Sequence, residues 1–189
     1  MKRIEIAVEG MTPLLTHNPI GMTAGNGPAP PSKGKQDFGT PEEQAAVGVY
    51  RSTEGFCCIP ALAFRSCLIA AAAVYKVPKQ RSSYQSRVTH IMAFPELTPI
   101  LDAEGDPYQT FAVDARRVMV QKNGVIRCRP RFEPWAAKFV FELDEGLADP
   151  EAVVTMLADG GNRVGVGDYR PQKKGWFGRF TIAGWEEVA

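Results

Sequence analysis

The chain has 189 residues, of which 44% are hydrophobic and 23% are charged, proportions that are ordinary for a folded globular protein with one sizeable core. No apolar run approaches the roughly 18 to 20 residues that a membrane-spanning helix needs, and the first residues alternate like a strand rather than a signal peptide. We therefore expect a soluble, cytoplasmic protein with no membrane partner. The formal net charge of +1 excludes a protein that coats nucleic acid by bulk positive charge.

Cysteine and histidine are too scattered for a zinc site. The two histidines, His17 and His90, lie far apart, and the four cysteines include no C-x-x-C pair. Cys67 lies in an alanine-rich segment and Cys128 alternates with arginines, a pattern typical of small buried residues in a reducing compartment. The sequence predicts no metal and no cofactor.

The N-terminal part of the chain predicts a strand, a long insertion and a helix. Apolar and polar residues alternate from Ile4 to Val8, which is the period of a half-buried strand. Residues 18–54 begin with a stretch rich in glycine and proline and poor in apolar anchors, which predicts a flexible insertion within one domain. Residues 61–76 carry apolar side chains at helical spacing and predict the first helix.

The clearest predicted element is a β-hairpin over residues 115–132, after a polar, basic loop at 77–86 and a short strand at 97–101. Asn123-Gly124 separates its two alternating runs and favours the positive φ values of a type I′ turn. Pro130 indicates that the second strand lies at an edge or leaves the sheet. A two-residue turn predicts these pairs on one face: Val118 with Arg129, Val120 with Arg127, and Arg116 with Arg131.

The C-terminal part predicts a strand, a helix, a loop and a last strand. Residues 138–143 alternate, and Asp149-Pro150-Glu151 gives an N-cap and first turn for a second helix, which Gly160-Gly161 should end. The final strand lies around Phe180. The order of elements predicts one α+β domain over residues 1–189, with a ferredoxin-like (RRM-like) βαββαβ core, an inserted flexible loop and an extra β-hairpin.

Positive charge is gathered in two stretches of the sequence, and the second of them is the predicted hairpin. Residues 55–95 and 115–132 contain no Asp or Glu. In the hairpin, the alternation places four arginines on one strand face, where their mutual repulsion is tolerable only beside an anion or an acidic surface. A polyphosphate backbone is one such counter-charge, and pairing to acids of the same chain is the alternative. The four arginines are Arg116, Arg127, Arg129 and Arg131.

A glycine-rich basic loop at residues 160–178 is the second candidate binding element. Its glycines allow the backbone to approach a ligand closely, and its aromatic and basic side chains suit the bases and phosphates of a single strand. The alternative is a long connection with Trp176 and Phe177 in the core. The candidate nucleic-acid-binding residues of this loop are Tyr169, Arg170, Lys173, Lys174 and Trp176.

His17 follows the first strand and is the one candidate for catalysis. A metal-free ribonuclease needs a histidine near the scissile phosphate as general base and a cation that holds the developing charge. No partner for His17 is evident in the sequence, and a structural role is the alternative. No pair of carboxylates and no G-x-S-x-G context points to another chemistry, so we expect a protein that is not an enzyme.

With these motifs in place, the whole chain resembles the RAMP superfamily, the RRM-like RNA-binding proteins of CRISPR systems. It is most similar to the backbone subunits that polymerise along guide RNA and to their short phage and prophage relatives. The residues that carry the resemblance are Ile59-Pro60-Ala61-Leu62 at the helix entry, the arginine hairpin, and Gly165-Val166-Gly167 followed by Gly175-Trp176-Phe177-Gly178, which is similar to the superfamily's glycine-rich loop. The insertion occupies the place of a thumb-like loop. The chain is shorter than those subunits, and its segment 127–135 matches none of them, so a stand-alone phage protein fits equally.

The leading hypothesis is a sequence-tolerant binder of single-stranded RNA or DNA that assembles as a homo-oligomer or filament along the strand. The resemblance implies a CRISPR or a phage context, with CRISPR or phage recombination proteins as partners. Two alternatives stay open at this point. One is a RAMP-like endoribonuclease with His17 as general base, and the other is a structural subunit that binds an acidic protein partner.

Overall fold

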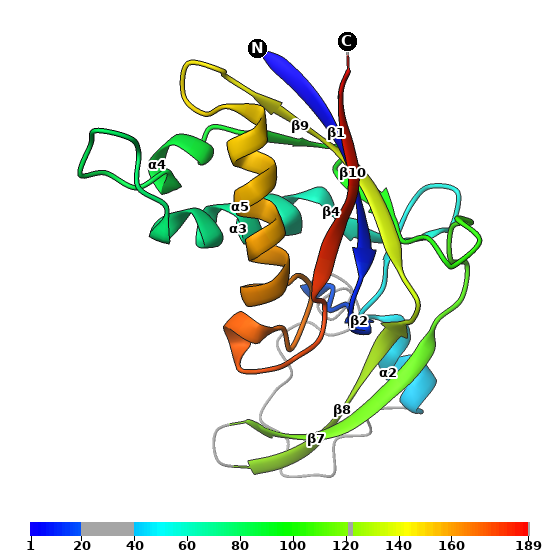
Figure 1. Ribbon diagram of the computed structural model, residues 1–189. Helices are drawn as coiled ribbons and strands as arrows, with labels where there is room; N and C mark the ends of the chain where they lie inside the picture. The colour runs from blue at the N-terminus through cyan, green and yellow to red at the C-terminus, as the bar shows by residue number, and fades with distance from the viewer. Residues whose placement is uncertain (20–39, 121–122, 189) are drawn as a thin grey trace.

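The computed structural model describes residues 1–19, 40–120 and 123–188, and these form a mixed α+β protein with several antiparallel sheets and four α-helices (Figure 1). Within this described part of the chain, every helix is too short or too polar to cross a membrane.

The largest sheet has four antiparallel strands in the order β10-β1-β9-β5. They are β1 (Lys2–Gly10), β5 (Met92–Phe94), β9 (Ala136–Leu143) and β10 (Phe180–Val188). The alternation predicted for the first strand is confirmed, since Ile4, Ile6 and Val8 are fully buried. The three residues of β5 gave no sequence signal, because a strand this short shows no clear alternation.

Two helices cover one face of this sheet (Figure 1). They are α3 (Ala61–Ala71), which the 3-10 turn η1 (Ala72–Val74) extends, and α5 (Pro150–Arg163). The ring of Phe64 in α3 stacks on Phe139 of β9 at 4.2 Å, so aromatic packing joins helix and sheet.

The prediction that Gly160-Gly161 ends the second helix is wrong, because α5 continues to Arg163. These glycines serve close packing instead of a turn. A Cβ on Gly160 would lie 2.9 Å from the Cβ of Ala71 in α3, and one on Gly161 would lie 2.3 Å from the carbonyl oxygen of Phe180. The predicted loop at 160–178 therefore begins only after residue 163.

The predicted flexible insertion at 18–54 is corrected in its second part, while residues 20–39 lie outside the described residues. Thr40 forms a capping box with Glu43 at the start of α2 (Pro41–Ala46). The next strand, β3 (Tyr50–Arg51), pairs with β4 (Cys57–Pro60), which also pairs with β6 (Leu97–Pro99). The predicted basic loop at 77–86 ends in a short helix, α4 (Gln85–Val88).

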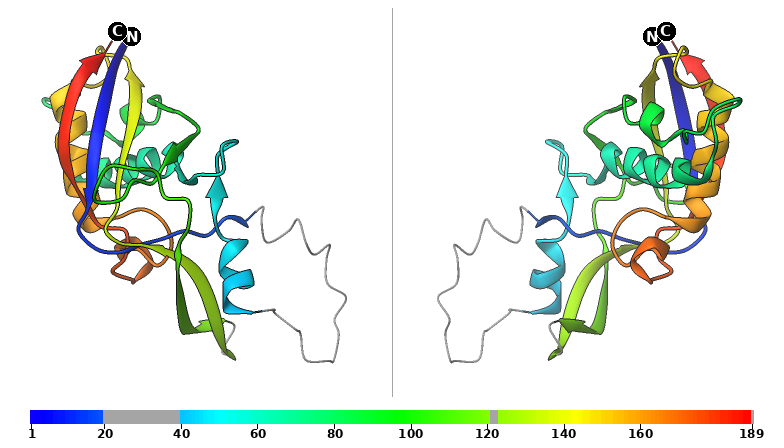
Figure 2. Two further views of the ribbon diagram at one scale, coloured as in Figure 1. Left: turned by 90° about the vertical axis from the view of Figure 1, so that its right-hand side faces the viewer. Right: turned by 90° about the vertical axis from the view of Figure 1, so that its left-hand side faces the viewer.

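The predicted hairpin exists but its register differs from the prediction. It consists of β7 (Ala112–Val120) and β8 (Asn123–Phe132), and its base pairs with β2 (Leu14–Leu15). Asn123 pairs with Val120 instead of forming the turn, and Arg116 pairs with Arg127 instead of Arg131. The nine-pair ladder outweighs the local turn preference of Asn-Gly. Figure 2 shows the hairpin projecting from the body with α2 beside it.

Candidate nucleic-acid interface

The hairpin places the four candidate arginines on one face, as predicted, because a register shift of four residues leaves the alternation unchanged. Opposite residues in an antiparallel pair share a face. Arg127 lies opposite Arg116, Arg129 opposite Asp114, and Arg131 opposite Ala112.

The loop after α5 folds back onto the base of this hairpin. Its glycines permit the path, since Gly165, Gly167 and Gly178 have φ values of +70°, +75° and +64°. A Cβ on Gly167 would lie 2.3 Å from the carbonyl oxygen of Leu15, which leaves no room for a side chain. The amide of Asp168 donates to the same oxygen at 2.8 Å. Strand β2 is thus bonded to the hairpin on one side and to the loop on the other.

Two side-chain contacts join the hairpin face to the loop. The Nε of Arg129 donates to Oδ2 of Asp168 at 2.5 Å. The guanidinium of Arg116 lies 4.6 Å from the ring centre of Phe177, within the range of a cation–π contact. The structure therefore brings the two sequence-predicted binding elements together on one surface.

Three of the four hairpin arginines already have a carboxylate partner in their own chain. Arg116 pairs with Asp114 at 2.7 Å, Arg131 pairs with Glu133, and Arg129 pairs with Asp168. Only 8% of the Arg129 side chain is exposed, and its Nη1 is buried without a hydrogen-bond partner among the described residues. Arg129 therefore acts as a structural clamp between hairpin and loop and offers little surface to a ligand.

The remaining candidate cations are more accessible. Lys173, at the end of the 3-10 turn η2 (Pro171–Lys173), and Lys174 are exposed. Arg127 is half-buried and has no ion-pair partner within the described ranges. Arg170 is half-buried and donates to the Gly167 carbonyl and the Gln172 side chain.

The aromatic side chains of the loop form a small platform around a buried ring. Phe177 is fully buried, as the alternative interpretation expected, whereas Trp176 is 52% exposed and Tyr169 is 36% exposed. The ring centre of Phe177 lies 4.8 Å from that of Trp176 and 6.0 Å from that of Tyr169. The two candidate stacking residues, Trp176 and Tyr169, are therefore open to solvent and pack against the buried ring of Phe177.

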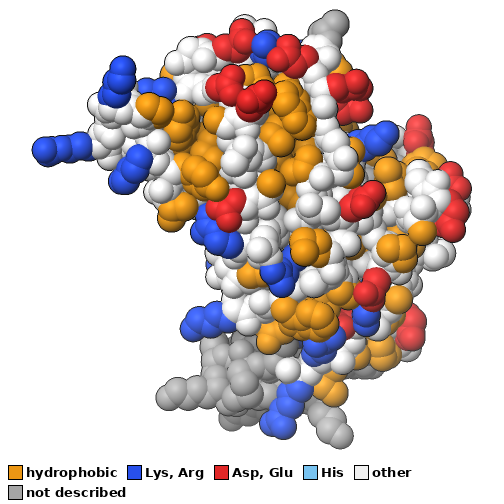
Figure 3. All heavy atoms as spheres, in the orientation of Figure 1, with side chains coloured by type: hydrophobic (Ala, Val, Ile, Leu, Met, Phe, Trp, Pro, Cys, Tyr) orange, Lys and Arg blue, Asp and Glu red, His pale blue; other side chains and the backbone are white. Residues whose placement is uncertain are grey.

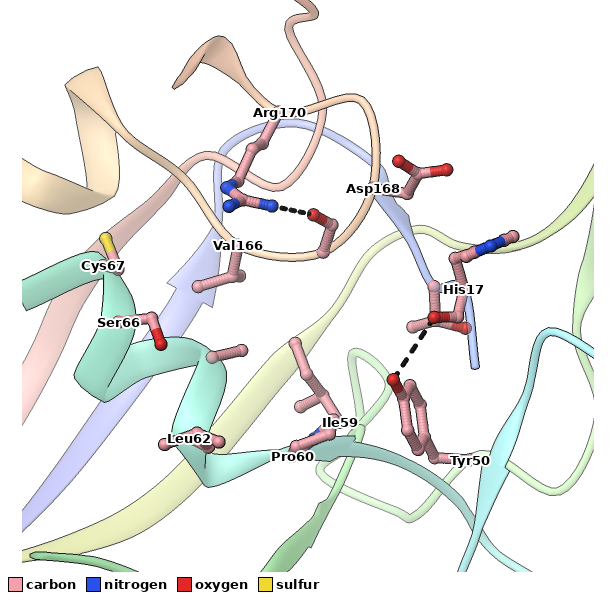
Figure 4. A pocket seen from close by; sticks show the side chains of 13 residues that line it. His17, Tyr50, Ile59, Pro60, Leu62, Ser66, Cys67, Val166, Asp168 and Arg170 are labelled. Atoms are coloured by element: carbon pink, nitrogen blue, oxygen red, sulfur yellow. Dashed lines mark hydrogen bonds between the residues drawn. The ribbon is translucent and has the colours of Figure 1, made fainter. Parts of the chain in front are cut away.

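A cavity of about 380 Å³ lies between this loop, the start of α3 and β3 (Figure 4). His17 lines it, and the hydroxyl of Tyr50 donates to the His17 carbonyl at 3.2 Å. Asp168 and Arg170 bring the loop to the same cavity. In Figure 4, the His17 ring and the Asp168 carboxylate both lie on the side of the cavity away from α3.

Burial and neighbouring charges shift the two titratable groups beside the hairpin. Burial lowers the pKa of His17, and the charges of Arg127 and Arg129 add to this effect, while Asp168 opposes it. Burial disfavours the ionised Asp168, but the charge and hydrogen bond of Arg129 outweigh it and hold the pKa of Asp168 below its ordinary value. At neutral pH the site therefore contains a neutral imidazole and an ionised carboxylate.

Two residues of this surface were not predicted from the sequence: Asp168 and Tyr50. Asp168 carried a signal, because it is the one acid in the basic segment 160–178. Tyr50 carried none, because only the tertiary fold brings it to His17. Figure 3 shows Lys and Arg side chains over the loop, the hairpin and the segment before α4, with most acids towards the termini and the opposite edge.

Across the described ranges, no group of three or more His, Cys, Asp or Glu side chains is placed to hold a metal ion. A comparison with protein-family models finds none that matches this chain, and a comparison with curated proteins finds no match either.

Proposed function

We propose that this protein is a ferredoxin-like, RAMP-like domain that binds single-stranded nucleic acid through the loop and hairpin surface. The strand order β10-β1-β9-β5 supports the fold assignment, with α3 following the first of these strands and α5 the third in chain order. This order fits the βαββαβ plan, with the β7–β8 hairpin inserted before the third strand.

The observation that carries the function is the joining of the arginine hairpin and the glycine-rich loop into one surface by the Arg129–Asp168 pair. Phosphates fit the accessible cations Arg127, Lys173 and Lys174, and bases fit the exposed ring of Trp176. Cations and aromatic faces that alternate along one surface are typical of sequence-tolerant binding to single strands.

The paired arginines are secondary ligands in this proposal. The Arg131 and Glu133 side chains are 36% and 50% exposed, and an exposed ion pair contributes only about 0 to 1 kcal/mol. A phosphate can therefore replace Glu133 at small cost, whereas Asp114, the partner of Arg116, is only 5% exposed and stays paired. Arg129 keeps its structural role.

The test is fluorescence anisotropy of labelled single strands over a range of salt concentrations. Affinity should fall steeply with salt, at a slope of about −0.7 per contacted phosphate on a log-log plot. Lys173→Gln/Lys174→Gln should weaken binding and reduce the magnitude of that slope by about 1.4 if each lysine holds one phosphate.

The matched control is Lys79→Gln/Arg81→Gln. It removes the same charge from the exposed segment before α4. Each double variant also replaces one lysine in the left-handed conformation, Lys174 at φ +62° and Lys79 at φ +61°, so backbone strain is balanced. Salt-insensitive binding, or equal losses in the two variants, contradicts the proposal.

Assembly along the strand belongs to the same proposal, in a CRISPR or a phage setting. Titration with strands of increasing length should then give complexes whose mass rises in steps of one protomer in analytical ultracentrifugation. A single protomer on every strand length contradicts assembly while leaving binding intact.

A second candidate function, endoribonuclease activity, is favoured by the environment of His17. Its lowered pKa leaves the imidazole neutral near pH 7, as a general base requires, and Arg127 and Arg129 act on it with positive charge. His17→Ala should abolish strand cleavage on denaturing gels but preserve binding. Intact RNA after incubation with the wild-type protein excludes this candidate.

A further inference from the structure

The cavity beside the loop has an apolar floor and one aromatic wall. Ile59, Pro60 and Val166 line it, and Leu62 reaches its rim with 57% of its surface exposed. The Tyr50 ring forms a wall, and its hydroxyl is fixed on the His17 carbonyl (Figure 4). Flat apolar walls suit the face of an aromatic heterocycle.

The cavity shares a wall with the loop that is proposed to bind the strand. Gly167, Asp168 and Arg170 line it, and all three belong to the glycine-rich loop that carries Lys173 and Lys174. A base that leaves the stack between neighbouring nucleotides could therefore enter the cavity while its phosphates stay on the lysines.

Arg170 supplies a polar edge to the cavity. A guanidinium has five N–H groups. Nε and Nη2 each donate to the Gln172 side chain, and Nη1 donates to the Gly167 carbonyl. One N–H on each Nη atom has no partner among the described residues, so Arg170, which lines the cavity, has two donors on neighbouring nitrogens to offer a ligand as a fork. The hydroxyl of Ser66, on the α3 side of the cavity, adds one more donor.

A fork of two donors distinguishes the bases by their acceptors. Guanine presents two adjacent acceptors, O6 and N7, whereas adenine presents a donor beside N7. Uracil has no such pair, because its N3 carries a proton between O2 and O4. Cytosine presents O2 beside N3, but its single ring covers less of the apolar walls than a purine does. Arginine is accordingly the commonest partner of guanine in specific contacts.

We propose that this cavity takes one unstacked nucleobase of the bound strand and prefers guanine. This inference rests on the proposed function, because the strand backbone delivers the base. Binding is then tolerant of sequence except at one nucleotide for each bound protomer.

The test compares short uridine-rich strands, as RNA and as DNA, that differ at one central position. That position holds guanine, adenine or an abasic site, and anisotropy gives the affinity for each strand. The wild-type protein should bind the guanine strand at least about fivefold more tightly than the abasic strand, the lower end of what one stacked base contributes. The adenine strand should lie between them.

Two variants assign this difference to the cavity. Ser66→Trp fills it from an exposed position of α3 and should remove the preference while leaving affinity for the abasic strand unchanged. Arg170→Lys keeps the charge without the fork and should make guanine and adenine equal. Ser86→Trp is the control, because Ser86 is exposed in α4 and outside the cavity. Circular dichroism checks that each variant folds.

The outcomes separate this inference from the proposed function. Equal wild-type affinity for all three strands overturns the base cavity and leaves backbone binding intact. An equal loss on every strand in Ser66→Trp also overturns it, since the cavity would then be part of the backbone path. Failure to bind any strand rejects the proposed function and the cavity proposal together.

Discussion

The buried pair between Arg129 and Asp168 gives the sharpest prediction about stability. Asp168→Asn leaves the Arg129 guanidinium without its counter-charge, although only 8% of that side chain is exposed. Removing one partner of a buried pair costs about 3 to 5 kcal/mol. We expect the lower end, about 3 kcal/mol, because solvent reaches the Asp168 side chain, which is 30% exposed.

Thermal and urea unfolding followed by circular dichroism measure this loss. For a chain of this size, about 3 kcal/mol corresponds to a fall in Tm of roughly 6 to 12 °C. Glu133→Gln is the matched control, since it breaks the Arg131–Glu133 pair, whose side chains are 36% and 50% exposed. That change should cost less than about 1 kcal/mol. Equal losses in the two variants would refute the clamp.

The same pair predicts a dependence on pH. The pKa of Asp168 is depressed in the folded protein, so its contribution is present above the unfolded-state value of about 4 and is lost as the pH falls through the folded-state value. The free energy of unfolding that separates the wild type from Asp168→Asn should therefore shrink below about pH 4. A difference that stays constant down to pH 2.5 contradicts this assignment.

Three further predictions concern single residues. Trp176→Ala should weaken single-strand binding by about 1 to 3 kcal/mol with only a small fall in Tm, because the side chain is half exposed; anisotropy and a thermal melt measure the two effects. Gly161→Ala should destabilise the protein by about 1 to 3 kcal/mol in urea unfolding despite its helical position, whereas Gly184→Ala, whose Cβ meets nothing within 4 Å, should not. Burial raises the pKa of Cys67 to about 12, so a thiol reagent should label Cys67 only as fast as the protein unfolds, after the more exposed Cys128; rapid labelling of Cys67 in the folded protein contradicts its burial.

The sequence predicted an element correctly where the interactions that form it join residues close together in the chain. The alternation around Ile6 gave β1, and Asp149 with Pro150 gave the start of α5. Both depend on residues that are neighbours along the chain. The hairpin face was also predicted correctly despite the wrong register, because the error was an even number of residues.

The errors arose where distant contacts decide the outcome. Glycine ends many helices because of its conformational freedom. Gly160 instead lies against Ala71 of another helix and stays helical. The carboxylate partner of Arg129 was invisible for the same reason, since Asp168 reaches it only through the folded loop. A search of the basic loop for its single acid would have suggested that pair.

The position of β2 has a mechanical consequence. This two-residue strand is hydrogen-bonded to β8 on one side, and its Leu15 carbonyl holds the amide of Asp168 on the other. Hairpin, loop and the start of the segment with His17 are therefore connected through one short piece of backbone. A force applied to the hairpin by a taut strand would be transmitted directly to the walls of the cavity, so a fluorophore on the hairpin should report events at His17.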